Sequence, residues 1–325
     1  MPSTVARETR GRKASPRTRS PHEHPWYDRV LKLTIPGPLS PHVDLWTRTL
    51  MLDKRISTVY HYRREIIHLA RAFPDKAAGD FGRVDLLSYV AEAGEGKAPS
   101  TIKKTIAAIK QFFLFLAEME VIDKDPARFL KSPAQRPVEP RYLSEADVSK
   151  LFAHALRDGL GMTVFMGLAY FAAMRAGSIN ALQWEDVDLE EGILTVRNAK
   201  GGKYYQVPIH PELDKLLRAW SEASRENDSG YVHAHIWRGE WKGYYYTGPL
   251  KRFKTIVEKA CLPPDTAPHD LRRSSATHMH SAGKQISVIS SVLGHASITT
   301  TARHYAFTTT TQTRDAVSTL GLHPF

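Results

Sequence analysis

Apolar residues recur at helical spacing through the first third of the chain. Over residues 57–73 they lie three or four positions apart, which predicts an amphipathic helix. A similar series from Ile102 to Leu116 follows an Ala-Pro-Ser sequence in which Ser100 is a plausible N-cap. A shorter helix is predicted near residues 85–92. We therefore expect residues 38–131 to form a helical bundle.

Two of these helices also carry a polar stripe that is largely basic. The first stripe comprises His61, Arg64, His68 and Arg71. The second comprises Lys103, Lys104 and Lys110. A solvated helix surface would explain either stripe alone, whereas two stripes in one small bundle favour a surface that contacts DNA.

Residues 132–140 interrupt the pattern, because they hold three prolines and cannot form a helix interior. We interpret them as an extended linker. After it, Ser144 and Asp147 are typical of a capped helix start, so a second domain is predicted over residues 141–310. Residues 311–325 form a polar C-terminal tail.

The second domain is predicted to be mostly helical, with one β-hairpin. An apolar helix ends near Met174, and the hairpin strands run over residues 193–197 and 204–209 on either side of a Gly-rich turn. Further helices are expected over residues 176–182, 211–223, 250–261, 270–282 and 286–293. The predicted fold class is therefore mainly α with a small β-hairpin (α+β), in two domains.

The charge of the chain narrows the class of partner. The 325 residues include 45 Lys and Arg against 34 Asp and Glu, and most of the net charge of +11 lies before residue 132. This excess indicates an anionic partner, with nucleic acid first. Residues 1–37 form a basic stretch without periodicity, predicted to be disordered. It either lies on phosphates or is a terminus without a role.

Several classes of protein are disfavoured. The longest apolar run, residues 162–174, is too short to span a bilayer, and no signal peptide is evident, so we expect a cytoplasmic, nucleoid-associated chain with no membrane partner. The single cysteine, Cys261, excludes a disulfide framework. Three spaced histidine pairs could contact a metal, namely His22/His24, His233/His235 and His278/His280. No cysteine or carboxylate motif accompanies them, so we predict no metal and no cofactor.

The candidate chemistry lies in three short motifs of the second domain. They are Met174-Arg175, His269-Asp270-Leu271-Arg272, and Leu293-Gly294-His295, with Tyr305 ten residues beyond His295. His269 and Arg272 share one face at a predicted helix start, where an anion is stabilised. Taken singly, each residue can be explained without a catalytic role, as an ion pair, a helix cap or a packing residue.

In this order the motifs resemble the tyrosine recombinase (phage integrase) family, with a Xer- or Cre-like two-domain layout. The resemblance covers residues 141–310 and, more loosely, the helical domain before them. It rests on H-x-x-R with leucine before the arginine, on L-G-H, and on the tyrosine that follows. Ser178 stands where many members carry a glutamate, and Tyr305 lies one residue beyond the commoner spacing.

The resemblance implies a role for each motif. A phenol attacks a DNA phosphodiester and forms a 3′-phosphotyrosyl link, two arginines hold the non-bridging oxygens, two histidines assist proton transfer, and a lysine in the hairpin turn protonates the 5′-oxygen. The phenol is that of Tyr305, the arginines are Arg175 and Arg272, and the histidines are His269 and His295. The lysine is Lys200, with Lys203 as the alternative. Lys203 and Arg273 are also expected to contact DNA.

The resemblance further implies a C-shaped clamp on double-stranded DNA carrying a specific site. Four protomers would exchange strands through a Holliday junction without ATP, with an accessory protein as an optional partner. The C-terminal tail, residues 311–325, would contact a neighbouring protomer; the alternative is that it frays. Three alternatives stay open: a type IB topoisomerase-like relaxase, a catalytically silent DNA-binding regulator and a metal-dependent nuclease. A silent regulator would be expected to lack one of the two arginines, His269 or Tyr305, and all four are present.

Overall fold

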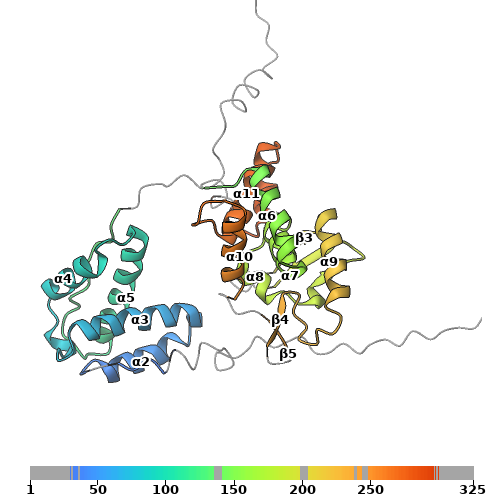
Figure 1. Ribbon diagram of the computed structural model, residues 1–325. Coiled ribbons are helices and arrows are strands. Elements are labelled where there is room, and N and C mark those ends of the chain that lie inside the picture. Colours follow the sequence, from blue (N-terminus) through green and yellow to red (C-terminus); the bar gives the residue numbers. More distant parts are fainter. Residues whose placement is uncertain are drawn as a thin grey trace, which may run out of the picture. The chain divides into compact units, whose positions relative to one another are not determined.

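The computed structural model describes residues 30, 32–35, 37–134, 141–197, 204–237, 240–243, 248–295, 297 and 299 (Figure 1). For residues 236–237, 240–242 and 248 only the backbone is described. The chain divides into two compact units, within residues 1–137 and 138–325. Most of the predicted basic tail, residues 135–140 of the predicted linker and all of the predicted C-terminal tail lie outside the described ranges.

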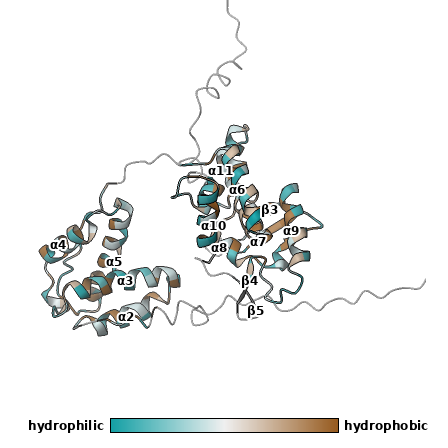
Figure 2. Cartoon of the chain, in the orientation of Figure 1, coloured by the Kyte–Doolittle hydropathy of each residue, from teal (hydrophilic) through white to brown (hydrophobic). Residues whose placement is uncertain are grey.

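The N-terminal unit is helical, as the periodicity predicted. It contains α2 (Ser40–Leu50), α3 (Ile56–Ala72), α4 (Arg83–Gly94) and α5 (Pro99–Glu118). Their apolar faces meet in one core, where the rings of Trp46 and Phe112 pack edge to face at 5.1 Å. Figure 2 shows the apolar faces of these helices as brown segments of the ribbon.

The predicted N-cap of α5 is wrong. The helix begins at Pro99, and Ala98 takes the extended conformation of an N-cap residue, with φ −62° and ψ 145°. Ser100 therefore lies inside the first turn. Proline suits the first helical position because its φ is already helical and the N–H that it lacks would be unpaired there anyway.

The C-terminal unit is mainly helical with a small antiparallel sheet, so the predicted fold class is confirmed. Its helices are α6 (Glu145–Asp158), α7 (Leu160–Tyr170), α8 (Ala176–Ala181), α9 (Pro211–Ala223), α10 (Gly248–Lys259), α11 (Pro268–Ser281) and α12 (Ile286–Val292). The sheet runs in the order β1 (Val187–Asp188), β2 (Ile193–Val196), β3 (Tyr205–Pro208), with Leu194 opposite Val207. A second hairpin, β4 (Ala234–Trp237) with β5 (Glu240–Gly243), was not predicted.

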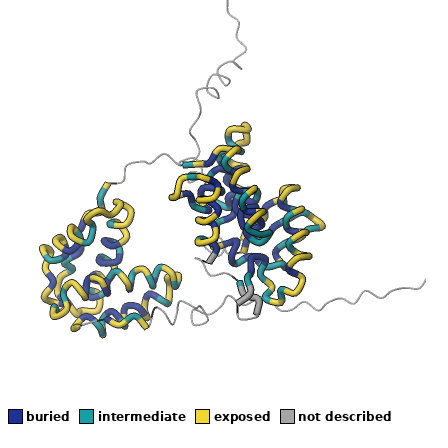
Figure 3. Tube along the Cα trace, in the orientation of Figure 1, coloured by how far each residue is buried: buried dark blue, intermediate teal, exposed yellow. Residues whose placement is uncertain are grey.

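Helix α7 forms the centre of this unit. It is apolar on every side and buried along most of its length, and it packs against α6, α9 and α11 (Figure 3). The sequence predicted that it would continue to about Met174, which is wrong. It ends at Tyr170, and Ala173 then takes a left-handed φ of +48° before α8 begins. This turn separates α7 from Arg175.

No helix in the described parts of the chain is long and apolar enough to cross a lipid bilayer.

Candidate active site

Arg272 connects three separate segments of the C-terminal unit. It lies on α11 and is 1% exposed. Its guanidinium donates hydrogen bonds to the backbone oxygens of Ala173 and Leu293, the latter at 2.7 Å, and Nη2 lies 3.1 Å from Nε2 of His295. A guanidinium can only donate, so Nε2 of His295 accepts. Two predicted site residues, Arg272 and His295, are thus in direct contact.

The turn after α7 brings Arg175 close to Arg272. The sequence placed it at the end of the apolar helix, but it is the N-cap residue of α8, with φ −75° and ψ 144°. Its side chain is half-buried. Ala173, whose carbonyl Arg272 holds, is only two residues before it. Arg272 therefore fixes the backbone from which Arg175 projects.

His269 lies in the first turn of α11, three residues before Arg272. Loss of hydration lowers the pKa of His269 to about 4, and the positive charges of Arg273, Arg272 and Arg175 contribute to the lowering. The residue is nevertheless exposed at the surface. The charges of the three guanidiniums disfavour the protonated imidazole at this position. Arg175, His269 and Arg272 thus share one electrostatic environment.

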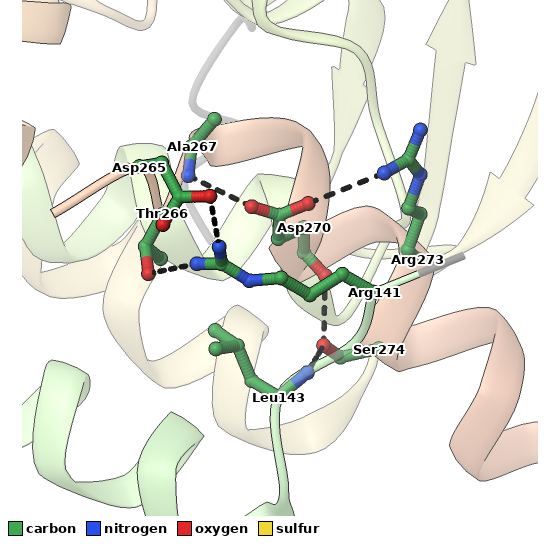
Figure 4. Close-up of polar contacts among 8 residues, drawn as sticks. All are labelled: Arg141, Leu143, Asp265, Thr266, Ala267, Asp270, Arg273 and Ser274. Atoms are coloured by element: carbon green, nitrogen blue, oxygen red, sulfur yellow. Dashed lines mark hydrogen bonds and ion pairs between the residues drawn. The ribbon is translucent and has the colours of Figure 1, made fainter. Parts of the chain in front are cut away.

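The start of α11 is held by its own cap and by the chain that enters this unit (Figure 4). The Asp270 carboxylate accepts a hydrogen bond from the backbone N–H of Ala267 at 2.9 Å and lies 3.5 Å from Arg273. The backbone N–H of Leu143 donates to Oγ of Ser274 at 2.8 Å. Sequence reasoning missed these supporting residues, although an aspartate in the third position of a helix signals a cap.

The Leu293-Gly294-His295 turn requires its glycine for two reasons. Gly294 has a left-handed φ of +56°, which favours glycine. A Cβ atom at this position would also collide with the ring of Tyr205 on β3. Leu293 is fully buried in a small core with Ala173, Ala276 and Ile289. The turn that carries His295 is therefore packed against both the sheet and α11.

Three predicted site residues lie outside the described ranges. They are the predicted nucleophile Tyr305 and both predicted general-acid lysines, Lys200 and Lys203. The described part of the site therefore consists of Arg175, His269, Arg272 and His295, with Arg273 beside it. Arg273 has a one-third exposed side chain.

The polar stripes of the N-terminal unit lie on α3 and α5, and we call them together the α3–α5 basic face. Its members are exposed, apart from the half-buried Lys110, and comprise His61, Arg64, His68, Arg71, Lys103, Lys104 and Lys110. Although His61 lies at the surface, loss of hydration lowers its pKa, and the charges of Arg64 on α3 and Lys104 on α5 lower that pKa further. The two stripes therefore adjoin at these residues. A hydrogen bond of 2.9 Å from Thr105 to Glu65 joins the two helices beside them.

Arg63, which the sequence analysis did not single out, holds α3 from its buried side. It is 2% exposed and donates hydrogen bonds to Oγ1 of Thr47 at 2.8 Å, to Oδ1 of Asp44 at 2.7 Å and to the backbone oxygen of Leu33 at 3.0 Å. These bonds fix α3 against α2 and so direct its basic stripe outward.

Two of the three histidine pairs considered for metal binding lie in the described ranges, and both have other contacts. His233 is buried, its Nδ1 lies 3.0 Å from Oδ1 of Asn180, and burial lowers its pKa to about 3. Nδ1 of His278 lies 2.8 Å from the Tyr170 hydroxyl. Among the described residues no three His, Cys, Asp or Glu side chains form a group that could hold a metal ion. His22 and His24 lie outside these ranges.

Known proteins match this chain over both of its units. Residues 141–311 match the model of the phage integrase family, and residues 43–120 match the N-terminal SAM-like domain of phage integrases. The tyrosine recombinase XerD of Ralstonia nicotianae is 32% identical over 286 residues, which cover 83% of this chain and 90% of that protein. The tyrosine recombinase XerC of Erythrobacter litoralis is 30% identical over 259 residues, covering 75% of this chain and 80% of XerC.

Solved structures show the same fold at lower identity. A lambda integrase tetramer bound to a Holliday junction is 19% identical, with a TM-score of 0.68 over 82% of this chain and 76% of that one. The Tn1549 transposon integrase in complex with circular intermediate DNA is 16% identical, with a TM-score of 0.66 over 85% of this chain and 98% of that one. The family matches over both domains and the 32% identity to XerD establish that the chain belongs to the phage integrase family of tyrosine recombinases, enzymes that catalyse DNA strand exchange.

Proposed function

We propose that the chain is a site-specific recombinase that cleaves and rejoins DNA through a covalent link between Tyr305 and a 3′-phosphate. The observation that carries this proposal is the cluster around Arg272, which gathers His295, His269 and the backbone that bears Arg175. Two guanidiniums and two imidazoles offer the positive charge and the N–H donors that a phosphodiester needs.

In this mechanism Arg175 and Arg272 bind the non-bridging oxygens of the scissile phosphate. The five-coordinate transition state carries more negative charge than the diester, so fixed donors stabilise it more than the ground state. Arg272 is oriented by two backbone carbonyls, so its guanidinium needs little reorganisation when DNA binds.

Proton transfer divides between the attacking and the leaving oxygen. Only about one tyrosine in a thousand is ionised at pH 7, so Tyr305 needs a proton acceptor. His269, with its pKa lowered to about 4, is neutral at that pH and accepts the phenol proton. His295 hydrogen-bonds the phosphate and assists the transfer. Lys200, or alternatively Lys203, protonates the departing 5′-oxygen.

The covalent link makes the reaction reversible without ATP or a metal ion. The O–P bond to Tyr305 forms as the bond from phosphorus to the 5′-oxygen breaks. A second 5′-hydroxyl then attacks the phosphotyrosine and releases the phenol. Because each step exchanges one phosphoester for another, the bond energy stays in the protein–DNA link until the strands rejoin.

DNA binding is assigned to both units. The α3–α5 basic face in residues 38–131 binds backbone phosphates, and Arg273 adds a contact beside the catalytic residues of residues 141–310. In this proposal the two units close on opposite sides of a duplex as a C-shaped clamp. The lambda integrase tetramer on a Holliday junction supports a homotetramer on two copies of a specific site. The chain would act in the cytoplasm, on the nucleoid.

The proposal is tested with a nicked suicide duplex whose site is first selected from a library of random duplexes by binding. The full-length protein is expected to form an SDS-resistant adduct in EDTA, with the DNA mapped to Tyr305 by mass spectrometry. Tyr305→Phe should form no adduct and retain DNA binding. An adduct at another residue, or cleavage that EDTA abolishes, contradicts the proposal. Relaxation of supercoiled DNA without recombinant products would favour the topoisomerase-like alternative.

A further inference from the structure

The segment that enters the C-terminal unit is fixed to the turn before the active-site helix. Arg141 donates a hydrogen bond from Nη2 to Oγ1 of Thr266 at 2.5 Å, and its Nη1 lies 2.5 Å from Oδ2 of Asp265 (Figure 4). Two residues later, Leu143 donates its N–H to Ser274. These partners are 125 and 131 residues away in the sequence. Arg141 also stands close to the boundary between the two compact units.

Two of the groups that receive these bonds are buried, one on the active-site helix and one in the turn just before it. Thr266 is 2% exposed and Ser274 is fully buried. Oγ of Ser274 donates in turn to the backbone oxygen of Asp270 at 2.7 Å. His269 and Arg272 lie between the two attachment points. The entering segment therefore holds α11 on both sides of the residues that face the phosphate in the proposed mechanism.

The ion pair between Arg141 and Asp265 does not by itself explain how the entering segment holds α11. Asp265 has a 76% exposed side chain, and exposed ion pairs contribute little to stability because water screens them. The bond to Thr266 differs, since this hydroxyl is buried and accepts a hydrogen bond from Arg141. A planar guanidinium reaches both groups at once, which a lysine cannot do with the same geometry.

We propose that Arg141 is a positioning residue for His269 and Arg272. By holding residues 265–266, it sets where α11 begins and hence where both side chains stand relative to the scissile phosphate. This inference rests on the proposed function. Because a displacement of about 1 Å in a reacting group can cost roughly a hundredfold in rate, loss of Arg141 should slow cleavage about ten- to a hundredfold without changing DNA affinity.

The test compares Arg141→Gln with a matched control, Arg252→Gln, in the full-length protein. Arg252 pairs with Asp158 at 2.7 Å and joins α10 to α6, and neither helix carries a predicted site residue. Single-turnover adduct formation is measured on the suicide duplex at saturating protein, with DNA affinity by fluorescence anisotropy and Tm by calorimetry. Both variants should bind DNA and melt alike, and only Arg141→Gln should form the adduct slowly.

A second variant, Thr266→Val, removes the hydroxyl and leaves the ion pair in place. It should slow cleavage in the same direction, and the double variant should cleave no more slowly than Arg141→Gln alone, since the two residues act through one contact. Should Arg141→Gln fold poorly, Thr266→Val alone decides the question.

Three results would overturn the inference: a wild-type cleavage rate in Arg141→Gln, an equal slowing in Arg252→Gln, or additive losses in the double variant. Wild-type protein that forms no adduct at Tyr305 would overturn the proposed function and this inference together. A normal wild-type adduct with an unaffected Arg141→Gln would overturn only the inference.

Discussion

Replacing Arg272 with lysine tests whether the geometry of the guanidinium matters beyond its charge. Arg272 is buried and donates to two backbone oxygens, of Ala173 and Leu293, and both of these residues are fully buried. An ammonium is a single donor centre and cannot span both carbonyls as the planar fork does. At least one carbonyl would therefore be left without a partner and without water to replace it.

The expected loss of stability in Arg272→Lys follows from the number of carbonyls left without a partner. A buried carbonyl without a partner costs about 1–3 kcal/mol, so we expect Arg272→Lys to lower the free energy of unfolding by at least that amount. Loss of one fixed donor to a developing negative charge costs about 2.7–4 kcal/mol of transition-state stabilisation, or roughly a hundred- to a thousandfold in cleavage rate. Stability and rate should therefore fall together, although the formal charge is unchanged.

Urea unfolding at pH 7 measures the first effect, and single-turnover adduct formation on the suicide duplex measures the second. The stability measurement does not depend on the proposed function. A variant within about 0.5 kcal/mol of wild type, the range of an ordinary surface substitution, would refute the view that the guanidinium joins the segments of Ala173 and Leu293. Normal stability with lost cleavage would confine the role of Arg272 to the phosphate.

Gly294→Ala should lower the free energy of unfolding by about 2–5 kcal/mol, because it combines a left-handed residue with a collision against the ring of Tyr205. Gly283→Ala is the matched control: it has a φ of +76° but open space around it, so urea unfolding should show a loss of only about 1–2 kcal/mol, and equal losses would exclude a role for the ring. The pKa values of His233 and His269, about 3 and about 4, lie below the ordinary value, so between pH 6.5 and 5 the unfolded chain binds more protons than the native one. Stability should therefore be full above pH 6.5 and fall as the pH decreases, with His233 contributing up to about 1.4 kcal/mol per pH unit, and His233→Gln should flatten the dependence of urea unfolding on pH. A free energy of unfolding that rises on acidification in this range would contradict both assignments.

Local patterns predicted most helices well. Helix α9 begins and ends at the predicted residues, because Pro211 fits the first helical position and an apolar stripe continues to Ala223. The α6 N-cap is also confirmed, since Oγ of Ser144 accepts from the N–H of Asp147 at 3.1 Å. In both cases the residues that decide the boundary lie within a few positions of it.

The error at the end of α7 arose where contacts outside the helix decide the structure. The end of α7 carries no local signal, because residues 171–174 are as apolar as the helix itself. The turn is stabilised instead by a bond from the N–H of Met174 to the backbone oxygen of Leu168 at 3.0 Å, and by Arg272, 99 residues later, which holds the Ala173 carbonyl. Likewise, the motif spacing singled out Arg272 but could not indicate that its side chain is buried against the backbone.

The described site residues therefore differ in how far the fold depends on them. Arg272 is buried, and a buried charge is stable only where polar groups surround it. The carbonyls of Ala173 and Leu293 supply such groups, so the buried cation depends on them. Arg175 and His269 are more exposed, and the proposed mechanism gives them the phosphate contact and the proton transfer. Because Arg272 also holds the backbone before Arg175 and contacts His295, the geometry of the proposed phosphate site is built together with the core. Substitutions at Arg175 or His269 should accordingly lower the free energy of unfolding less than any substitution at Arg272.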